Sequence, residues 1–224
     1  AAFALPAVLL IQWSLSPEAQ ATIDSRFFGF IWNSGILAAS SATGGVLIGL
    51  PIAYLASRRP TMLNLGCLQA AYAGYVLPGP VAALAVLVLF TKLAPVVYGS
   101  VLILIVAYVI HFLPAGLQSL EPALQHMSPN LEEVARTLGL GMRDTWRRVT
   151  LPLIRNGFVV AWVLIFLQTI KELPATLLLR PVGFDTLAIR VWMEASEEYF
   201  QLAAPSALLI VLLSLPALAL LVSK

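Results

Sequence analysis

The chain has 224 residues, of which 60% are apolar and 11% are charged, and its formal net charge is +2. A soluble domain of this size carries about a quarter charged residues, so this composition excludes a water-facing globule and predicts an all-α integral membrane protein. The single cysteine, Cys67, excludes an intrachain disulfide, and no Cys/His pair has the spacing of a zinc site.

Six apolar segments are candidates for membrane spans, each of which needs about 20 mostly apolar residues. In chain order they are residues 1–15, which is short, 30–56, 66–90, 96–117, 157–179 and 203–222. Prolines fall within or near the ends of several segments, where they are expected to kink the helices. The sequence therefore predicts about six transmembrane helices.

The basic residues predict the orientation, because cytoplasmic loops carry an excess of lysine and arginine. Arg58 and Arg59 lie between the second and third spans, and Lys224 closes the chain. Between the fourth and fifth spans lie Arg136, Arg143, Arg147, Arg148 and Arg155. These alternate loops are predicted to be cytoplasmic, and both termini with them.

The long basic loop predicts two short helices outside the bilayer. The first is expected to begin at Ser128-Pro129, where serine caps and proline suits the first helical position. Gly139 and Gly141 are expected to end it, and a second helix over 143–150 is expected to stop at Leu151-Pro152. An apolar stripe runs along the first helix: Leu131, Val134, Ala135 and Leu138. These residues favour equally a docking helix for a partner and a helix packed on its own bundle.

Two adjacent opposite charges, Lys171 and Glu172, are predicted inside the fifth span, where ionisable residues are costly. They are candidates for a pathway or gate near the outer face. Two structural roles are equally compatible with these residues: an ion pair between helices, or extension of the Lys171 side chain to the membrane interface. Pro174 is expected to break the helix there. Tyr54, Tyr72, Tyr75 and Tyr108 are scattered, so aromatic packing is their expected role, and His111 is expected to be packed or hydrogen-bonded.

Residues 181–202 are predicted to form an external amphipathic segment that follows Asp185 and Thr186, a predicted N-cap pair. Apolar residues recur there at helical spacing: Ala188, Val191, Trp192, Ala195, Tyr199 and Leu202. The other face carries Arg190, Glu194, Glu197, Glu198 and Gln201. This pattern is typical of a helix that lies along the outer membrane surface.

One spacing in the basic loop is similar to a known motif. Glu133-Val134-Ala135, three residues, Gly139, nine residues and then Val149-Thr150-Leu151-Pro152 resemble the EAA motif of ATP-binding-cassette (ABC) importer permeases. Val134 departs from the usual alanine and Val149 from the usual isoleucine. The stretch KELPATLLLRP at 171–181, with Asn33-Ser34, Ala53-Tyr54 and Ala107-Tyr108, is most similar to ferric-iron-type permeases, and specifically to their second half.

The resemblance implies a type I ABC importer permease (MetI-like) fold, with one permease domain over 1–224 and a cytoplasmic coupling loop over 119–156. Glu133 would meet a basic group of a partner ATPase, Gly139 would form the turn, and Ala135 and Leu138 would fill a cleft of that partner. The implied ATPase-coupling residues are Glu133, Val134, Ala135, Leu138, Gly139, Val149, Leu151 and Pro152. A solvated carboxylate at a helix start is the alternative for Glu133.

The expected partners follow from what the chain lacks and from the resemblance. No G-x-x-x-x-G-K-[ST] motif occurs, so the chain is not expected to be the ATPase itself. No nucleophile–His–acid set and no metal motif is visible either, so a membrane enzyme has little support. The resemblance implies that ATP and Mg are bound by the partner ATPase, with no cofactor or metal in this chain. The resemblance further implies a second permease half or copy, a periplasmic or lipoprotein solute-binding protein, the lipid bilayer of the inner membrane, and no nucleic acid. Ferric iron is the expected solute. The alternatives are thiamine, a polyamine or a phosphonate, and a secondary transporter without an ATPase.

Overall fold

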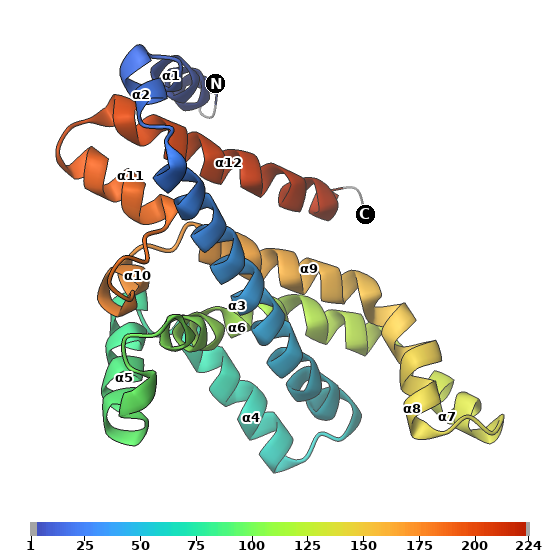
Figure 1. The fold of residues 1–224 in the computed structure, drawn as a ribbon. Coiled ribbons are helices and arrows are strands. Elements are labelled where there is room, and N and C mark those ends of the chain that lie inside the picture. Colours follow the sequence, from blue (N-terminus) through green and yellow to red (C-terminus); the bar gives the residue numbers. More distant parts are fainter. Residues whose placement is uncertain (1–3, 223–224) are drawn as a thin grey trace.

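A computed structural model describes residues 4–222, and all regular structure within that range is helical. The predicted all-α class is therefore confirmed. The helices are α1 (Ala4–Ser14), α2 (Pro17–Ala21), α3 (Ser25–Arg58), α4 (Met62–Tyr72), α5 (Gly79–Leu93), α6 (Val101–His126), α7 (Asn130–Thr137), α8 (Met142–Thr145), α9 (Leu151–Ile170), α10 (Pro174–Leu179), α11 (Leu187–Ser196) and α12 (Phe200–Val222) (Figure 1).

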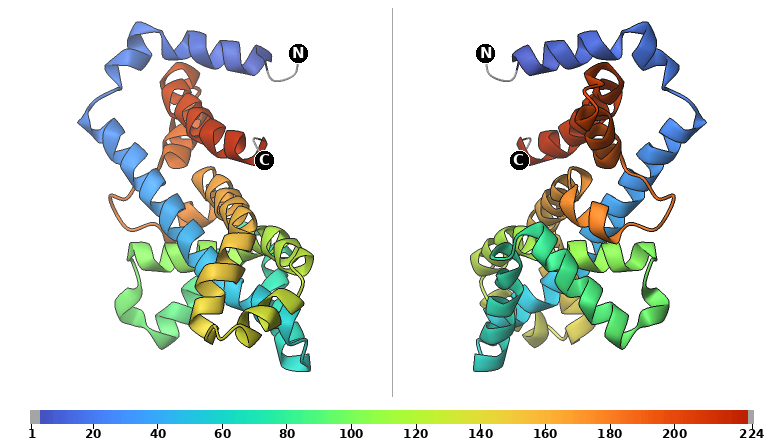
Figure 2. Two further views of the ribbon diagram at one scale, coloured as in Figure 1. Left: turned by 90° about the vertical axis from the view of Figure 1, so that its right-hand side faces the viewer. Right: turned by 90° about the vertical axis from the view of Figure 1, so that its left-hand side faces the viewer.

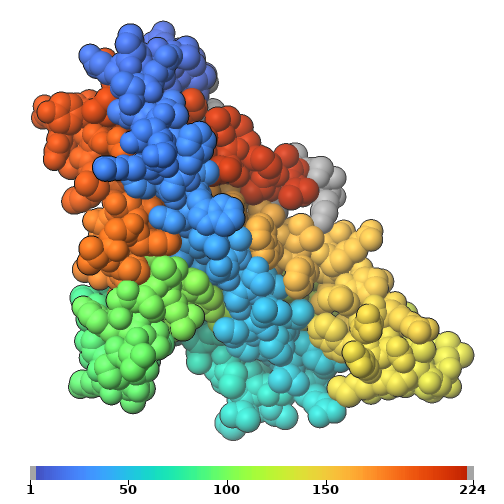
Figure 3. Space-filling view, viewed as in Figure 1, coloured from blue at the N-terminus to red at the C-terminus, as the bar shows by residue number. Residues whose placement is uncertain are grey.

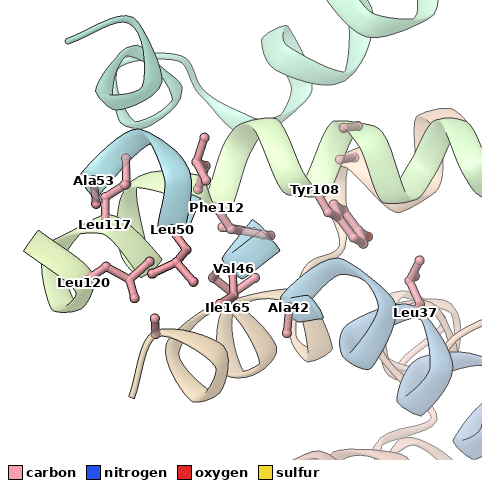
Figure 4. Packing of buried hydrophobic residues seen from close by; sticks show 14 of the residues in the cluster. Leu37, Ala42, Val46, Leu50, Ala53, Tyr108, Phe112, Leu117, Leu120 and Ile165 are labelled. Carbon is pink, nitrogen blue, oxygen red and sulfur yellow. The ribbon is translucent and has the colours of Figure 1, made fainter. Parts of the chain in front are cut away.

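The core forms where α3, α6 and α9 pack against one another (Figure 4). Two glycines allow these helices to approach closely. A Cβ atom built on Gly45 of α3 would lie 2.7 Å from Cδ1 of Ile165, and one on Gly116 of α6 would lie 2.8 Å from the same atom. The Ile165 side chain of α9 therefore fills the space that the two missing methyl groups leave.

In the part of the chain that the structure describes, four helices are long and apolar enough to cross a membrane: α3, α6, the continuous helix over 142–170, and α12. Helix α3 has 34 residues and α6 has 26, so at about 1.5 Å per residue both exceed the roughly 30 Å of hydrocarbon. Both helices are therefore long enough to span with a tilt or with ends outside the apolar layer. Helix α1 has 11 residues and is too short to span; residues 1–3 of that predicted segment lie outside the described residues.

The predicted third span, 66–90, is a broken one. The chain bends by 117° between α4, with the short turn that follows it, and α5, and the two helices would together make a fifth span or a re-entrant loop. The chain breaks at 76–78, where Pro78 adopts an extended conformation (φ −55°, ψ 142°) and lacks the N–H that a continuing helix would need. A short 3₁₀ turn over Ala73–Tyr75 precedes this break and packs on α6.

The predicted fifth span, 157–179, ends earlier than expected. Helix α9 stops at Ile170, and α10 is a separate short helix that has Pro174 in its first turn. Lys171 and Glu172 therefore lie in the connection between two helices rather than inside a span. Proline at the start of a helix costs no hydrogen bond, whereas within a continuing helix it would remove one.

The predicted external segment over 181–202 also differs from the structure. The Thr186 side chain caps α11, as predicted, by accepting from the N–H of Ile189. The helix ends at Ser196, however, and a turn that includes Glu198 at φ 65° leads into α12. Helix α11 therefore packs as a hairpin on α12 instead of continuing to residue 202.

The α1–α2 pair and the α7–α8 pair lie at opposite ends of the molecule (Figure 1). Helices α1 and α2 lie beside α12 at one end, where the Trp13 and Phe200 rings stack with centroids 6.1 Å apart (Figure 2). Helices α7 and α8 protrude at the opposite end (Figure 3). Arg58 contacts Met127 there, so the first two basic loops lie on the same side of the helices, as their predicted alternation requires.

Candidate functional site

The protruding segment is centred on α7, whose C-terminal end is closed by a complete glycine cap. Gly139 has a φ of +88°, its N–H donates to the carbonyl of Arg136, and the N–H of Leu140 donates to the carbonyl of Ala135. These two bonds form a Schellman motif, which requires a left-handed residue. The predicted role of Gly139 in ending the helix is confirmed. Gly141, at φ −66°, instead begins the next helix.

The outer face of α7 is apolar. Leu131, Val134 and Leu138 are 45%, 53% and 78% exposed, while Ala135 is only 6% exposed and faces the interior of the chain. Three of the four predicted stripe residues therefore point outward together, and Ala135 lies apart from them. Glu133 is exposed beside this face. An exposed apolar helix face rimmed by charge is typical of a surface that meets another protein.

The inner face of α7 is held by Glu132. Its carboxylate accepts hydrogen bonds from the hydroxyl groups of Tyr54 on α3 (3.1 Å) and Thr150 (2.9 Å). Arg58, at the end of α3, places its Nε 3.6 Å from the same carboxylate, and its Nη2 donates to the carbonyl of Met127 at 3.0 Å. The Arg58 and Glu132 side chains are 9% and 6% exposed, so this is a buried ion pair.

Sequence reasoning missed Glu132 and chose its neighbour. Glu132 and Ala135 are three residues apart and therefore share one face of α7, turned away from Leu131 and Val134. Two features of the sequence could have identified Glu132. It shares a helix face with the small residue Ala135, and Arg58 lies in the other basic loop. A pocket of about 220 Å³ lies beside the pair, with Glu133 and Arg136 among its lining residues.

The helix after α7 does not stop at Leu151-Pro152, and that prediction is wrong. Helix α8 continues through a π-helical turn over Trp146–Thr150 directly into α9, and the N–H of Leu151 donates to the carbonyl of Trp146. The wider turn accommodates the proline, which has no N–H to donate. Val149 is half-buried, whereas Leu151 and Pro152 are exposed. The Trp146 ring packs edge-on against Tyr54, with centroids 5.7 Å apart.

Of the second predicted set, Lys171, Glu172 and Pro174, only Glu172 is shown to bond the first turn of α10. The Glu172 carboxylate accepts from the N–H of Ala175 (3.1 Å), and its carbonyl accepts from the Thr176 hydroxyl (2.9 Å). Lys171 and Pro174 are exposed and Glu172 is half-buried. Glu172 thus bonds the helix that follows it, and within residues 4–222 no ion pair joins it to another span. The pathway or gate role of these three residues stays a prediction.

The scattered tyrosines have a role beyond aromatic packing. Tyr54 bonds Glu132, Tyr72 donates to Glu121 at 2.7 Å, and the hydroxyl groups of Tyr108 and Thr176 are hydrogen-bonded. Each phenol therefore ties one helix to another. His111 packs against Phe112, as expected, with ring centroids 4.7 Å apart. Among the described residues, no group of three or more His, Cys, Asp or Glu side chains could hold a metal.

Comparisons with known proteins agree on one family. Residues 45–223 match the profile of the binding-protein-dependent transport system inner membrane component. The chain is 32% identical over 212 residues to an Fe(3+)-transport system permease protein of Haemophilus influenzae, covering 94% of this chain and 42% of that protein. It therefore spans less than half the length of that relative.

Other relatives are named for other solutes. The chain is 30% identical over 194 residues to a molybdenum transport system permease protein of Mycobacterium bovis, covering 81% of this chain and 74% of that protein. It is 25% identical over 206 residues to a putative 2-aminoethylphosphonate transport system permease protein of Salmonella paratyphi A, with coverages of 85% and 77%.

A solved structure shares the fold. The inward-facing MetNI methionine ABC transporter matches with a TM-score of 0.67 at 17% identity, over 87% of this chain and 94% of that chain. The expected MetI-like arrangement of helices is confirmed.

Proposed function

This chain belongs to the family of binding-protein-dependent transport system inner membrane components, and from that premise we propose that it forms the transmembrane pathway of an ATP-driven importer. ATP hydrolysis would occur in a separate subunit that binds ATP and Mg. Solute would arrive on a separate binding protein, and a second permease half or copy would complete the pathway in the inner membrane.

The observation that carries this proposal is the form of α7. It protrudes from the helix bundle, exposes Leu131, Val134 and Leu138, and places Glu133 beside them, while a glycine cap and a buried carboxylate fix its position. Such a face suits a complementary cleft with a basic rim on the ATPase subunit. Force from nucleotide-driven closure of that subunit would enter the bundle at α7.

Ferric iron is the proposed solute. The support is the 32% identity to a protein named for Fe(3+) transport, which extends over nearly all of this chain. Molybdate is the second candidate, favoured by the 30% identity to a protein named for molybdenum transport. Ferric iron is a hard cation and molybdate is an oxyanion. Their charges are opposite in sign, so measuring the uptake of each distinguishes the two candidates. Reconstituted complex is expected to take up radiolabelled ferric iron and not radiolabelled molybdate; uptake of molybdate alone contradicts the choice of iron.

Two substitutions test the coupling role. Glu133→Lys reverses the exposed charge and Gly139→Pro destroys the cap, so each is expected to reduce ATP-driven uptake about tenfold or more while the chain still inserts in membranes. Glu197→Lys, an exposed carboxylate in the α11–α12 turn, is the matched charge control and should leave uptake unchanged. Full uptake and full ATP hydrolysis in both α7 variants would show that α7 does not transmit the motion.

A further inference from the structure

A buried ion pair lies where α7 meets the rest of the chain. Within the described residues, Glu132 is the one buried Asp, Glu, Lys or Arg, with 5% of the residue's surface exposed. The side chain of its partner Arg58 is 9% exposed. Neighbouring charges are open to solvent by comparison. The Asp144–Arg148 pair, which is also close to α7, has side chains 54% and 70% exposed.

The pair joins α7 to the ends of all three core helices. Arg58 and Tyr54 belong to α3, and Thr150 belongs to the turn that continues into α9. Arg58 also donates to the carbonyl of Met127, the residue that ends α6. A displacement of α7 therefore reaches α3, α6 and α9 through one carboxylate and one guanidinium group.

Stability alone does not account for this arrangement. Removing two charges from water is costly, and buried ion pairs are often no more stabilising than apolar residues of the same size. What the pair does supply is a fixed geometry. A carboxylate that accepts two hydrogen bonds and faces one guanidinium has few alternative positions, so α7 cannot turn or slide without breaking several contacts at once.

We infer that Glu132 is a positioning residue for energy coupling: paired with Arg58, it fixes α7 to the three core helices so that movement of α7 moves the bundle. This inference rests on the proposed function, in which α7 meets the ATPase subunit. It assigns the two adjacent carboxylates different tasks. Glu133 acts in contact with the partner, and Glu132 acts inside this chain.

The test uses the assembled transporter in proteoliposomes and measures two rates, ATP hydrolysis and uptake of radiolabelled ferric iron or molybdate, whichever the unmodified assembly accumulates. Glu132→Gln and Arg58→Gln each remove one charge of the pair. Each is expected to lower the solute accumulated per ATP hydrolysed about tenfold, within the range that changes at coupling residues produce. The ATPase subunit should still copurify in normal amount, because Leu131, Val134, Leu138 and Glu133 are untouched.

A double-mutant cycle shows whether the two residues act together. Each single substitution breaks the same contact. The double variant Arg58→Gln, Glu132→Gln should therefore accumulate no less solute per ATP hydrolysed than either single variant. Tyr54→Phe removes one hydrogen bond from the same carboxylate and provides a milder variant, with an expected loss of about twofold, should Glu132→Gln fail to insert. Asp144→Asn is the control for an exposed pair and should couple normally.

The outcomes separate this inference from the proposed function. Normal solute accumulation per ATP in Glu132→Gln and Tyr54→Phe, or additive losses in the double variant, would overturn the inference while leaving α7 as the docking helix. Loss of the ATPase subunit from Glu132→Gln would also overturn it, since Glu132 would then act in partner binding. If no ATPase subunit copurifies with the unmodified chain, the proposed function itself is wrong.

Discussion

Glu132 and Glu133 are chemically identical neighbours with opposite surroundings. Successive residues of a helix point about 100° apart, so one carboxylate of α7 faces the bundle while the next faces solvent. Glu132 is 5% exposed and bound by Tyr54 and Thr150, whereas Glu133 is exposed. The spacing of the EAA-like pattern points to Glu133, whereas the contacts of Glu132 become visible only in the fold.

Gly139 allows a residue-scale prediction about the α7 cap. Its φ of +88° is strained for any side chain, so Gly139→Ala is expected to weaken the cap by about 1 kcal/mol, and Gly139→Asn by less because asparagine tolerates this region. Local opening should then speed hydrogen exchange at the Leu138 and Leu140 amides about fivefold. Mass spectrometry of peptides over 130–141 measures this.

The matched control is Gly141→Ser, in the same turn. Gly141 has a φ of −66° and no heavy atom within 4 Å of a built Cβ, and serine is a favourable N-cap residue. Exchange in this variant should equal that of the unmodified chain. Equal exchange in Gly139→Ala would contradict the account of the cap.

Helices α6 and α9 approach each other closely where Gly157 of α9 faces α6. A Cβ on Gly157 would lie 2.4 Å from the Cβ of Ala123 and 3.2 Å from the carbonyl oxygen of Ser119. The Ser119 hydroxyl also donates to the carbonyl of Gly157 at 3.0 Å. Small residues and backbone contacts of this kind are typical of helix pairs in membranes.

Gly157→Ala is therefore expected to be destabilising, by about 1–3 kcal/mol, because two backbones must separate to admit one methyl group. The thermal unfolding midpoint of the purified chain in detergent measures the effect and should fall. Gly66→Ala, on α4 with nothing within 4 Å of a built Cβ, is the matched control and should melt at or slightly above the original midpoint. An unchanged midpoint for Gly157→Ala would rule out the close α6–α9 contact.

Sequence patterns predicted the elements better than their ends. Apolar length identified α3, α6 and α12, and the capping residues Thr186 and Gly139 identified the start of α11 and the end of α7. Prolines were harder to interpret, because they have three different effects in this fold. Pro78 breaks a span, Pro174 begins a new helix, and Pro152 lies in a continuous helix directly after a π-helical turn. Hydropathy does not distinguish these cases, because tertiary contacts decide which backbone groups can be left unpaired.

The candidate site was predictable in part. The position of α7 in the chain and its apolar face followed from residues near one another in sequence. The ion pair did not, because Arg58 and Glu132 are 74 residues apart, and only the packing of α3 against α6 and α7 brings them together. The burial of Ala135 has the same origin.

At the scale of the whole molecule, the protruding α7 is joined to the ends of the long core helices. Helix α3 runs from the α7 end towards α1 and α2, and the 142–170 helix leaves the same end and passes to the connection at Lys171 and Glu172 (Figure 1). If α7 meets the ATPase subunit as proposed, we expect a push on α7 to reach the opposite half of the bundle along these helices.

The most direct test of this account is site-specific cross-linking in native membranes from a photoreactive residue at Leu138, which is 78% exposed on α7. The control position is Val182, which is fully exposed in the connection between α10 and α11. These two helices lie away from α7 (Figure 1). We predict that Leu138 captures a nucleotide-hydrolysing subunit and that Val182 does not. Failure of Leu138 to capture such a subunit, in cells where the chain is active in uptake, would contradict the central claim.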